Sequence, residues 1–116
     1  MTDQSCLFCN IISGTIPAET VYQDDLVVAI KDVKPVAPVH QLLIPRRHVE
    51  SAAELVESDA AMLGRLFSVA ATLAGEAGVA ERGYRLVTNI GVDGGQSIAH
   101  LHFHLLGGRE FAWPPG

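Results

Sequence analysis

The sequence predicts a single α+β domain, with a five-stranded antiparallel sheet and two helices. Three observations predict this class. Five short segments rich in β-branched and apolar residues are joined by links of hairpin length. One longer segment repeats apolar residues at a spacing of three and four, the period of a helix. The segment Gln96–Leu106 instead alternates histidines with apolar residues, which is the period of a strand.

Length and composition limit the classes of protein that are possible. The 116 residues suffice for one domain, 1–116, and 48% hydrophobic with 18% charged residues is typical of a water-soluble chain. A net charge of −5 argues against nonspecific binding to nucleic acid or to an anionic membrane. Residues 1–5 lack the basic and apolar regions of a signal peptide, and no apolar run predicts a transmembrane helix. Two cysteines cannot form a secreted disulfide framework, so the expected location is the cytoplasm.

The first half of the chain is expected to form a short helix and three strands. Ser5 is a candidate cap for a helix over residues 6–12, and Ser13-Gly14 would end it. Strands are predicted at 21–23 and 26–30, joined at Asp24-Asp25. Two prolines keep residues 32–39 extended, so we expect a loop there and a third strand over 40–44.

The second half is expected to supply the long helix and the last two strands. Ser58 would cap a helix that ends near Ala77. Its predicted core stripe consists of Leu63, Leu66, Phe67, Ala70, Leu73 and Ala74. A fourth strand over 85–89, a glycine-rich loop over 90–95, the histidine strand and a stiff exposed tail follow. We expect the helices to cover one face of the sheet and the histidines to lie on the other, open face.

The histidines His100, His102 and His104 share one face of the predicted strand. Clustered titratable groups indicate a functional site. The residues themselves leave two chemistries open. One is metal binding. The other is nucleophilic catalysis, in which a neutral imidazole attacks phosphorus while its neighbours contact oxygens or transfer protons.

The pair Cys6-x-x-Cys9 has three interpretations. A redox motif normally follows a strand, and no strand is predicted upstream. Two buried cysteines without a function are the simplest interpretation. Two thiolates together with His48 and His100 could also form a tetrahedral zinc site, although the spacing is not that of a zinc finger.

The pattern His100-x-His102-x-His104-Leu105-Leu106, with apolar residues between the histidines, resembles the histidine triad (HIT) superfamily. The run 89–97, the sequence Gly107-Gly108-Arg109 and the ending Trp113-Pro114-Pro115-Gly116 are similar to its Hint branch in particular. The resemblance extends from Cys6 to the final glycine.

The resemblance implies a purine nucleotide hydrolase or nucleotidyl transferase that acts at the α-phosphate, in particular an adenosine phosphoramidase. His102 would form a nucleotidyl-histidine intermediate, with His104 and Ser97 contacting the phosphate and His40 supporting the nucleophile. Asp32 would accept both ribose hydroxyls, a role that suits an ionised carboxylate. Further nucleotide contacts would come from Asn89, Gln96, Phe8, Ile11, Ile30, Val33 and Trp113, although Ile11 and Ile30 fit a plain core equally well.

The resemblance also implies a metal and an assembly. Some HIT proteins, and their galactose-1-phosphate uridylyltransferase relatives, hold a structural zinc ion on residues that match Cys6, Cys9, His48 and His100. Many Hint-branch proteins lack these cysteines, and no catalytic metal is implied. The implied assembly is a homodimer with a continuous two-subunit sheet, in which the tail at about 109–116 reaches the partner's active site. The implied ligands are adenosine or guanosine monophosphate derivatives.

Three other functions remain open at this point. One is a dinucleoside polyphosphate hydrolase of the Fhit type, against which Gly107-Gly108-Arg109 and the tail argue. Another is a nucleotide-binding scaffold or regulator with incidental hydrolysis. The last is a metal-dependent hydrolase that uses the triad as ligands. The physiological substrate and the base preference do not follow from the sequence.

Overall fold

A computed structural model describes residues 5–116. Residues 1–4, on which the expectation of no signal peptide partly rests, lie outside the described residues. The elements are α1 (Leu7–Ile12), β1 (Thr20–Gln23), β2 (Val27–Lys31), β3 (Val39–Pro45), α2 (Ala60–Glu76), β4 (Tyr84–Val87) and β5 (Phe103–Gly107). Short 3-10 helices at Ala52–Glu54 and Glu57–Asp59 precede α2. In this described range no helix is both long and apolar enough to cross a bilayer.

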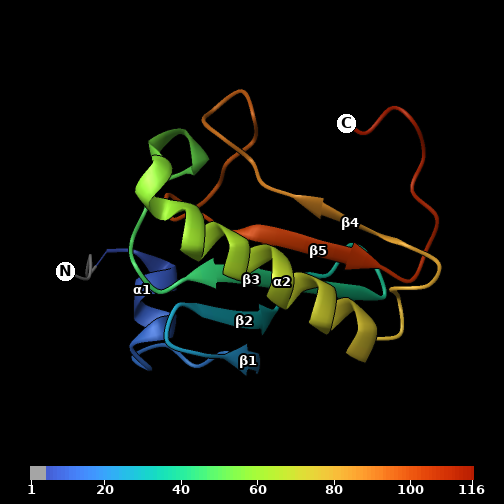
Figure 1. The fold of residues 1–116 in the computed structure, drawn as a ribbon, viewed down its shortest axis with the longest axis horizontal. Helices are drawn as coiled ribbons and strands as arrows, with labels where there is room; N and C mark the ends of the chain where they lie inside the picture. Colours follow the sequence, from blue (N-terminus) through green and yellow to red (C-terminus); the bar gives the residue numbers. More distant parts are fainter. Residues whose placement is uncertain (1–4) are drawn as a thin grey trace.

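The five strands form one sheet in the order β1-β2-β3-β5-β4 (Figure 1). Every neighbouring pair is antiparallel, which confirms the predicted α+β class and the strand number. The central pair joins β3 to β5, with Leu42 opposite His104 and Leu43 opposite Phe103. This pairing brings residues from the middle of the chain next to the histidine segment.

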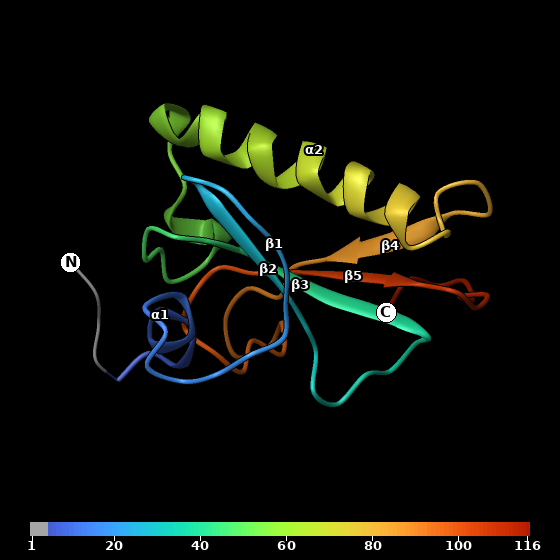
Figure 2. The same ribbon diagram turned by 90° about the horizontal axis from the view of Figure 1, so that it is seen from below.

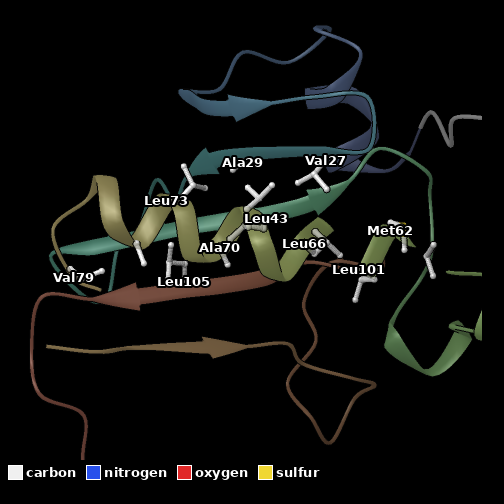
Figure 3. Packing of buried hydrophobic residues seen from close by; sticks show 13 residues of the cluster. Val27, Ala29, Leu43, Met62, Leu66, Ala70, Leu73, Val79, Leu101 and Leu105 are labelled. Atoms are coloured by element: carbon white, nitrogen blue, oxygen red, sulfur yellow. The ribbon is translucent and has the colours of Figure 1, made fainter. Parts of the chain in front are cut away.

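The two helices lie on opposite faces of the sheet (Figure 2). The expectation that helices would cover one face and leave the histidine face open is therefore wrong. α2 covers one face and forms the main core with β2, β3 and β5 (Figure 3). α1 lies against the other face, where a second core joins Phe8 to Val28, Ile30, Leu42 and Ile44. Because α1 covers this face, His100 is completely buried and His102 is 5% exposed.

Both helices begin at residues other than the predicted caps. The N-cap of α1 is Cys6, whose sulfur accepts a hydrogen bond from the Cys9 amide at 3.3 Å, in place of the expected Ser5. Ser58 lies inside the second 3-10 helix, and Asp59 is the N-cap of α2. The predicted end of α1 is confirmed, since Ser13 is its C-cap and Gly14 adopts a φ of +85°.

The core stripe of α2 is rotated relative to the prediction. Leu66, Ala70, Leu73 and Ala74 are buried as expected, whereas Phe67 is 49% exposed and Leu63 is only partly buried. Met62 and Val69 are buried instead. The spacing of three and four was correct, but it fits either of two adjacent stripes, and the packing on the sheet selects between them.

The histidine segment is a strand only in its second half. β5 begins at Phe103, and residues 98–100 form a bend. Pro45 at the end of β3 cannot donate a ladder hydrogen bond, and its carbonyl accepts from the His100 ring instead. The alternation nevertheless persists, since Leu101 and Leu105 lie in the α2 core while His100 and His102 lie on the α1 side.

The turn between β1 and β2 is tied to α2 through the Asp24 carboxylate. It accepts hydrogen bonds from the Leu26 and Val27 amides, both at 2.8 Å, from the Tyr22 hydroxyl at 2.6 Å and from Arg65 at 2.9 Å. Burial alone would raise the pKa of Asp24, but these four donors outweigh it and hold the pKa well below its ordinary value. The ionised form is therefore the native one.

We expect Asp24→Ala to lower the free energy of unfolding by about 2–4 kcal/mol, because it leaves two amides and a guanidinium without their acceptor. Since the pKa is lowered on folding, this contribution is present above pH 4 or so and is lost as the pH falls below it. Urea unfolding measures both effects. Asp25→Ala is the matched control, because that carboxylate is 82% exposed and should contribute less than about 0.5 kcal/mol. Equal losses in the two variants would contradict this account.

Candidate active site

His102 is held with one ring nitrogen bonded and the other available. Its Nδ1 lies 2.7 Å from the His100 carbonyl oxygen, which can only accept a hydrogen bond. The proton of the neutral ring is therefore on Nδ1, and Nε2 carries a lone pair. The Phe8 ring contacts the His102 ring edge-on, with centroids 4.9 Å apart, and fixes its plane. A ring held in this way has a lone pair that can act as a nucleophile.

His104 is paired with His40 rather than standing alone. His40 Nε2 and His104 Nδ1 are 2.9 Å apart. The Val36 amide donates to His40 Nδ1 at 3.1 Å, so the proton of the neutral His40 ring is on Nε2 and points at His104. His104 Nδ1 then accepts this proton in a hydrogen bond, which leaves the His104 proton on Nε2. The expected support of the nucleophile by His40 stays a prediction, and the hydrogen-bond partner of His40 among the triad histidines is His104.

Burial lowers the pKa of both His40 and His104. For His40 the carboxylate of Asp32 partly opposes this effect. For His104 the positive charges that His102 and His40 would carry when protonated add to it. Both rings are therefore neutral near pH 7. Only a neutral ring carries its proton on one nitrogen alone, so the tautomers assigned above apply to this state.

We expect NMR titration to place the ring pKa values of His40 and His104 below the ordinary value of 6.5. The unfolded chain then binds protons that the folded chain does not, so the free energy of unfolding should fall as the pH drops through this range. His40→Asn removes one of the two groups and should flatten that dependence. Ring pKa values above 6.5, or a stability that rises as the pH falls from 7, would be incompatible with these buried neutral rings.

Asp32 lies beside this pair at the start of the loop after β2. One carboxylate oxygen accepts from the Lys34 amide at 2.8 Å, and the other lies 3.3 Å from His40 Nε2. Asp32 and His40 line a cavity of about 370 Å³. The donor atoms of Asp32, His40 and His104 are close enough to hold a cation. The Val36 amide, however, leaves the proton on His40 Nε2, which favours hydrogen bonding over metal ligation at this place.

Of the other implied nucleotide contacts, only Phe8 has a recorded contact with a triad ring. Ser97 is exposed, Val33 is 90% exposed and Trp113 is 86% exposed. The side-chain amide of Asn89 donates to the Gly94 carbonyl. The Gln96 side chain accepts a hydrogen bond from the Gly91 amide in its own loop. It donates to the Ile98 carbonyl and to the carbonyl of Glu50, which belongs to a distant segment of the chain. Ile30 is buried in the second core and Ile11 packs against it, as the plain core interpretation predicts.

The second group of chemically active side chains brings Cys6, Cys9, His48 and His100 together, with all four donor atoms within 4.8 Å of one another. His100 Nδ1 lies 3.3 Å from Cys6 Sγ and 3.6 Å from Cys9 Sγ, and His48 Nδ1 lies 3.3 Å from Cys9 Sγ. Ligands on a tetrahedral zinc ion would have sulfur and nitrogen about 3.6 Å apart. The residues therefore fit a metal ion.

The protonation of the His100 ring also suits a ligand. Its Nε2 lies 2.8 Å from the Pro45 carbonyl oxygen and must donate, so Nδ1 presents its lone pair to the two sulfurs. Burial lowers the pKa of His100 and raises the pKa of Cys6. Without a cation the neutral thiol is favoured, and a bound cation would reverse this preference by stabilising the thiolate.

The positions that sequence reasoning missed are backbone atoms. The His100 carbonyl sets the tautomer of His102, the Pro45 carbonyl that of His100, and the Val36 amide that of His40. Every residue has such atoms, so no residue type signals them. The prolines around Val36 indicate only that this backbone is extended and fixed.

The fold and the site together define a class: a small α+β protein with three alternating histidines beside a single antiparallel sheet. A family model described as the HIT domain matches residues 13–111. The chain belongs to the HIT family.

Relatives and solved structures agree with this membership. An uncharacterized HIT-like protein of Synechococcus elongatus is 47% identical over 113 residues, which cover 97% of this chain and 98% of that protein. The solved HIT family hydrolase from Clostridium thermocellum is 46% identical with a TM-score of 0.93, covering 96% of each chain. The HIT family hydrolase from Legionella pneumophila is 44% identical with a TM-score of 0.95, covering 97% of this chain and 100% of that one.

Proposed function

We propose that this protein is a purine nucleotide hydrolase or nucleotidyl transferase that acts at the α-phosphate through a covalent intermediate on His102, and specifically an adenosine phosphoramidase. The observation that carries the proposal is the hydrogen bond of 2.7 Å from His102 Nδ1 to the His100 carbonyl. In the neutral ring this hydrogen bond puts the proton on Nδ1 and leaves the lone pair of Nε2 as a fixed nucleophile. Membership of a family with solved structures described as hydrolases supports the same reaction class.

The two half-reactions use the two tautomers described above. His102 Nε2 attacks the α-phosphorus and forms an N–P bond, while the bond from phosphorus to the leaving amine breaks. The Nε2–H of His104 can donate a hydrogen bond to a phosphate oxygen, and the departing amine takes up a proton from water. Water then attacks phosphorus and releases a proton to solvent, the N–P bond to His102 breaks to restore the lone pair on Nε2, and a nucleoside monophosphate leaves. Splitting one displacement into two in this way is the usual advantage of covalent catalysis.

The nucleotide itself would lie along the loop that contains Asp32. Asp32 lines the cavity together with His40, and an ionised carboxylate can accept both ribose hydroxyls. Phe8 and Val33 are proposed for the base, and Asn89, Gln96 and Ser97 for the phosphate and the leaving group. In the proposed homodimer, the exposed Trp113 of each tail would lie near the partner's site. Among residues 5–116, β4 pairs only with β5, so its outer edge is available to extend the sheet across the dimer.

We propose zinc as the ion for the four-residue group at the start of α1, because two thiolates and two imidazoles are its preferred tetrahedral set. In that position it would be structural, since four protein ligands leave no place for substrate. A bound zinc ion would hold Cys6 and Cys9 as thiolates and join the N-terminal segment to His100. The reaction described above uses only side chains.

A comparison of substrates tests the proposed activity. Turnover of an adenosine phosphoramidate is measured beside turnover of a diadenosine polyphosphate, with the same protein and buffer. The proposal expects kcat/KM to be higher for the phosphoramidate. A preference for the polyphosphate would favour the Fhit-type reaction, and no turnover of either with intact nucleotide binding would favour a scaffold.

A further inference from the structure

Arg109 is connected to the catalytic histidines through a single residue of backbone. Its Nε donates to the Val36 carbonyl at 3.1 Å. The amide of the same residue donates to His40 Nδ1, also at 3.1 Å. The Val36 side chain is 60% exposed, so what this position contributes to the site is its backbone. The C-terminal segment and the site thus meet at the two polar groups of Val36.

Several contacts hold this connection in place. Pro35 and Pro38 restrict the loop around Val36. Gly108 adopts a φ of +88°, and a Cβ there would lie 2.9 Å from Pro38 Cβ, so only glycine allows the two segments to approach. The Arg109 guanidinium in turn stacks on the Phe111 ring at 4.2 Å. Figure 1 shows the C-terminal segment leaving β5 at the end of the sheet where β3 begins.

The Val36 amide and the Asp32 carboxylate act on opposite nitrogens of His40, and both favour the proton on Nε2, which sets the direction of the chain of hydrogen bonds. With that amide on His40 Nδ1, protons lie on Nε2 of His40 and on Nε2 of His104. Without the amide, Nδ1 can also carry the proton, and only the longer contact of 3.3 Å from Nε2 to the Asp32 carboxylate still opposes this tautomer. His104 would then donate from Nδ1 to His40, and its Nε2 would be a lone pair. A lone pair cannot donate to a phosphate oxygen.

We propose that Arg109 is a positioning residue: by holding the Val36 carbonyl it fixes the backbone of Val36 and so the direction of its amide, which helps to fix which nitrogen of His104 carries the proton. The expected effect of Arg109 on kcat rests on the proposed function, whereas its expected effect on the tautomers of His40 and His104 does not. The lowered pKa values of His40 and His104 support it, because a tautomer is defined only for a neutral ring.

Val36→Pro is the most selective test, because proline removes the amide proton and no side chain of the site. Val36→Ala is its matched control and keeps the amide. Arg109→Ala removes the hydrogen bond to the Val36 carbonyl, and Arg109→Lys restores a donor. Arg82 lines the same cavity as Arg109, so Arg82→Ala controls for the loss of a positive charge there. The ring nitrogen shifts of His40 and His104 are measured by ¹⁵N NMR, and kcat and KM with an adenosine phosphoramidate.

We expect Val36→Pro and Arg109→Ala to move the His104 proton toward Nδ1. We expect kcat to fall about 10- to 100-fold while KM changes less than about twofold, as for loss of a hydrogen-bond donor that acts mainly in the transition state. The double variant Val36→Pro/Arg109→Ala should have a kcat no lower than that of the less active single variant, because both substitutions act through the Val36 amide. Val36→Ala and Arg82→Ala should resemble the wild type, and Arg109→Lys should recover part of kcat.

Wild-type tautomers in folded Arg109→Ala would overturn the proposal, whatever the rate. So would a kcat loss in Val36→Ala equal to that in Val36→Pro. Thermal unfolding identifies any variant that is not folded, and if Val36→Pro fails this check, Arg109→Ala decides, since its hydrogen bond is on the exposed surface. If the wild type has no phosphoramidase activity, the proposed function fails, while the NMR tautomers still confirm or refute the role of Arg109.

Discussion

Replacing His102 by alanine is expected to reduce turnover of an adenosine phosphoramidate by roughly 10⁴- to 10⁶-fold, the range for loss of a catalytic nucleophile. The residual rate would come from substrate binding and from the remaining hydrogen-bond donors. Nucleotide binding should persist with a Kd within about threefold of the wild type, because His102 contributes to the transition state rather than to recognition of the base. Steady-state kinetics and calorimetric titration with adenosine monophosphate measure the two quantities separately.

The matched control is His104→Ala. It removes a neighbouring imidazole of the same size but leaves the nucleophile, so we expect a loss of about 10²-fold. If the two variants lost activity equally and modestly, neither ring would be the nucleophile. In a cell that depends on this protein, full function of His102→Ala would favour a scaffold over an enzyme.

Removal of the metal is expected to have the largest effect on stability. An ion that binds only the folded chain stabilises it by about 4 kcal/mol when its free concentration is a thousand times Kd. Chelation, or Cys9→Ser, should therefore lower the unfolding temperature by more than 10 °C or so in a chain of this size. Elemental analysis of the purified protein should give one zinc ion per chain in the wild type and much less in Cys9→Ser.

Re-addition of zinc separates a specific site from a general effect of the chelator. It should restore the unfolding temperature of chelated wild type, whereas magnesium should not, because thiolate ligands are soft. Chelated protein that is still folded should keep turning over substrate, since the zinc lies outside the proposed reaction. Complete loss of activity in folded, metal-free protein would favour the metal-dependent hydrolase. A wild type that carries no metal and is insensitive to chelation would remove the zinc proposal.

Much of the fold could be predicted from the sequence, because local patterns determine it. The periods of two and of three and four identified the strands and α2, and β-branched runs placed β2 and β3 within one or two residues. The errors occur where tertiary structure decides. Phe67 and Val69 both fit a helical apolar stripe, and only packing on the sheet exposes the first and buries the second. Similarly, a proline at the end of β3 delays the start of β5.

The site was predictable to the level of residue types and no further. Three alternating histidines identified the segment, and two cysteines three apart identified the possible metal ligands. The roles of the rings depend on partners that the sequence does not mark. The three carbonyl or amide groups at His100, Pro45 and Val36 determine which nitrogen of each ring is free. These contacts make the histidines unequal, and we propose His102 as the nucleophile, His104 as a hydrogen-bond donor and His100 as a metal ligand.

The most direct test of the covalent mechanism is to trap the intermediate. The wild type is mixed with an adenosine phosphoramidate, quenched in alkali on the millisecond scale, digested and analysed by mass spectrometry, because a phosphorus–imidazole bond survives base better than acid. The mechanism predicts a single peptide heavier by one adenylyl group, with the group on His102, which appears and decays at rates that account for turnover. Turnover without any such peptide, or an adenylyl group on another residue while His102→Ala remains active, would contradict it.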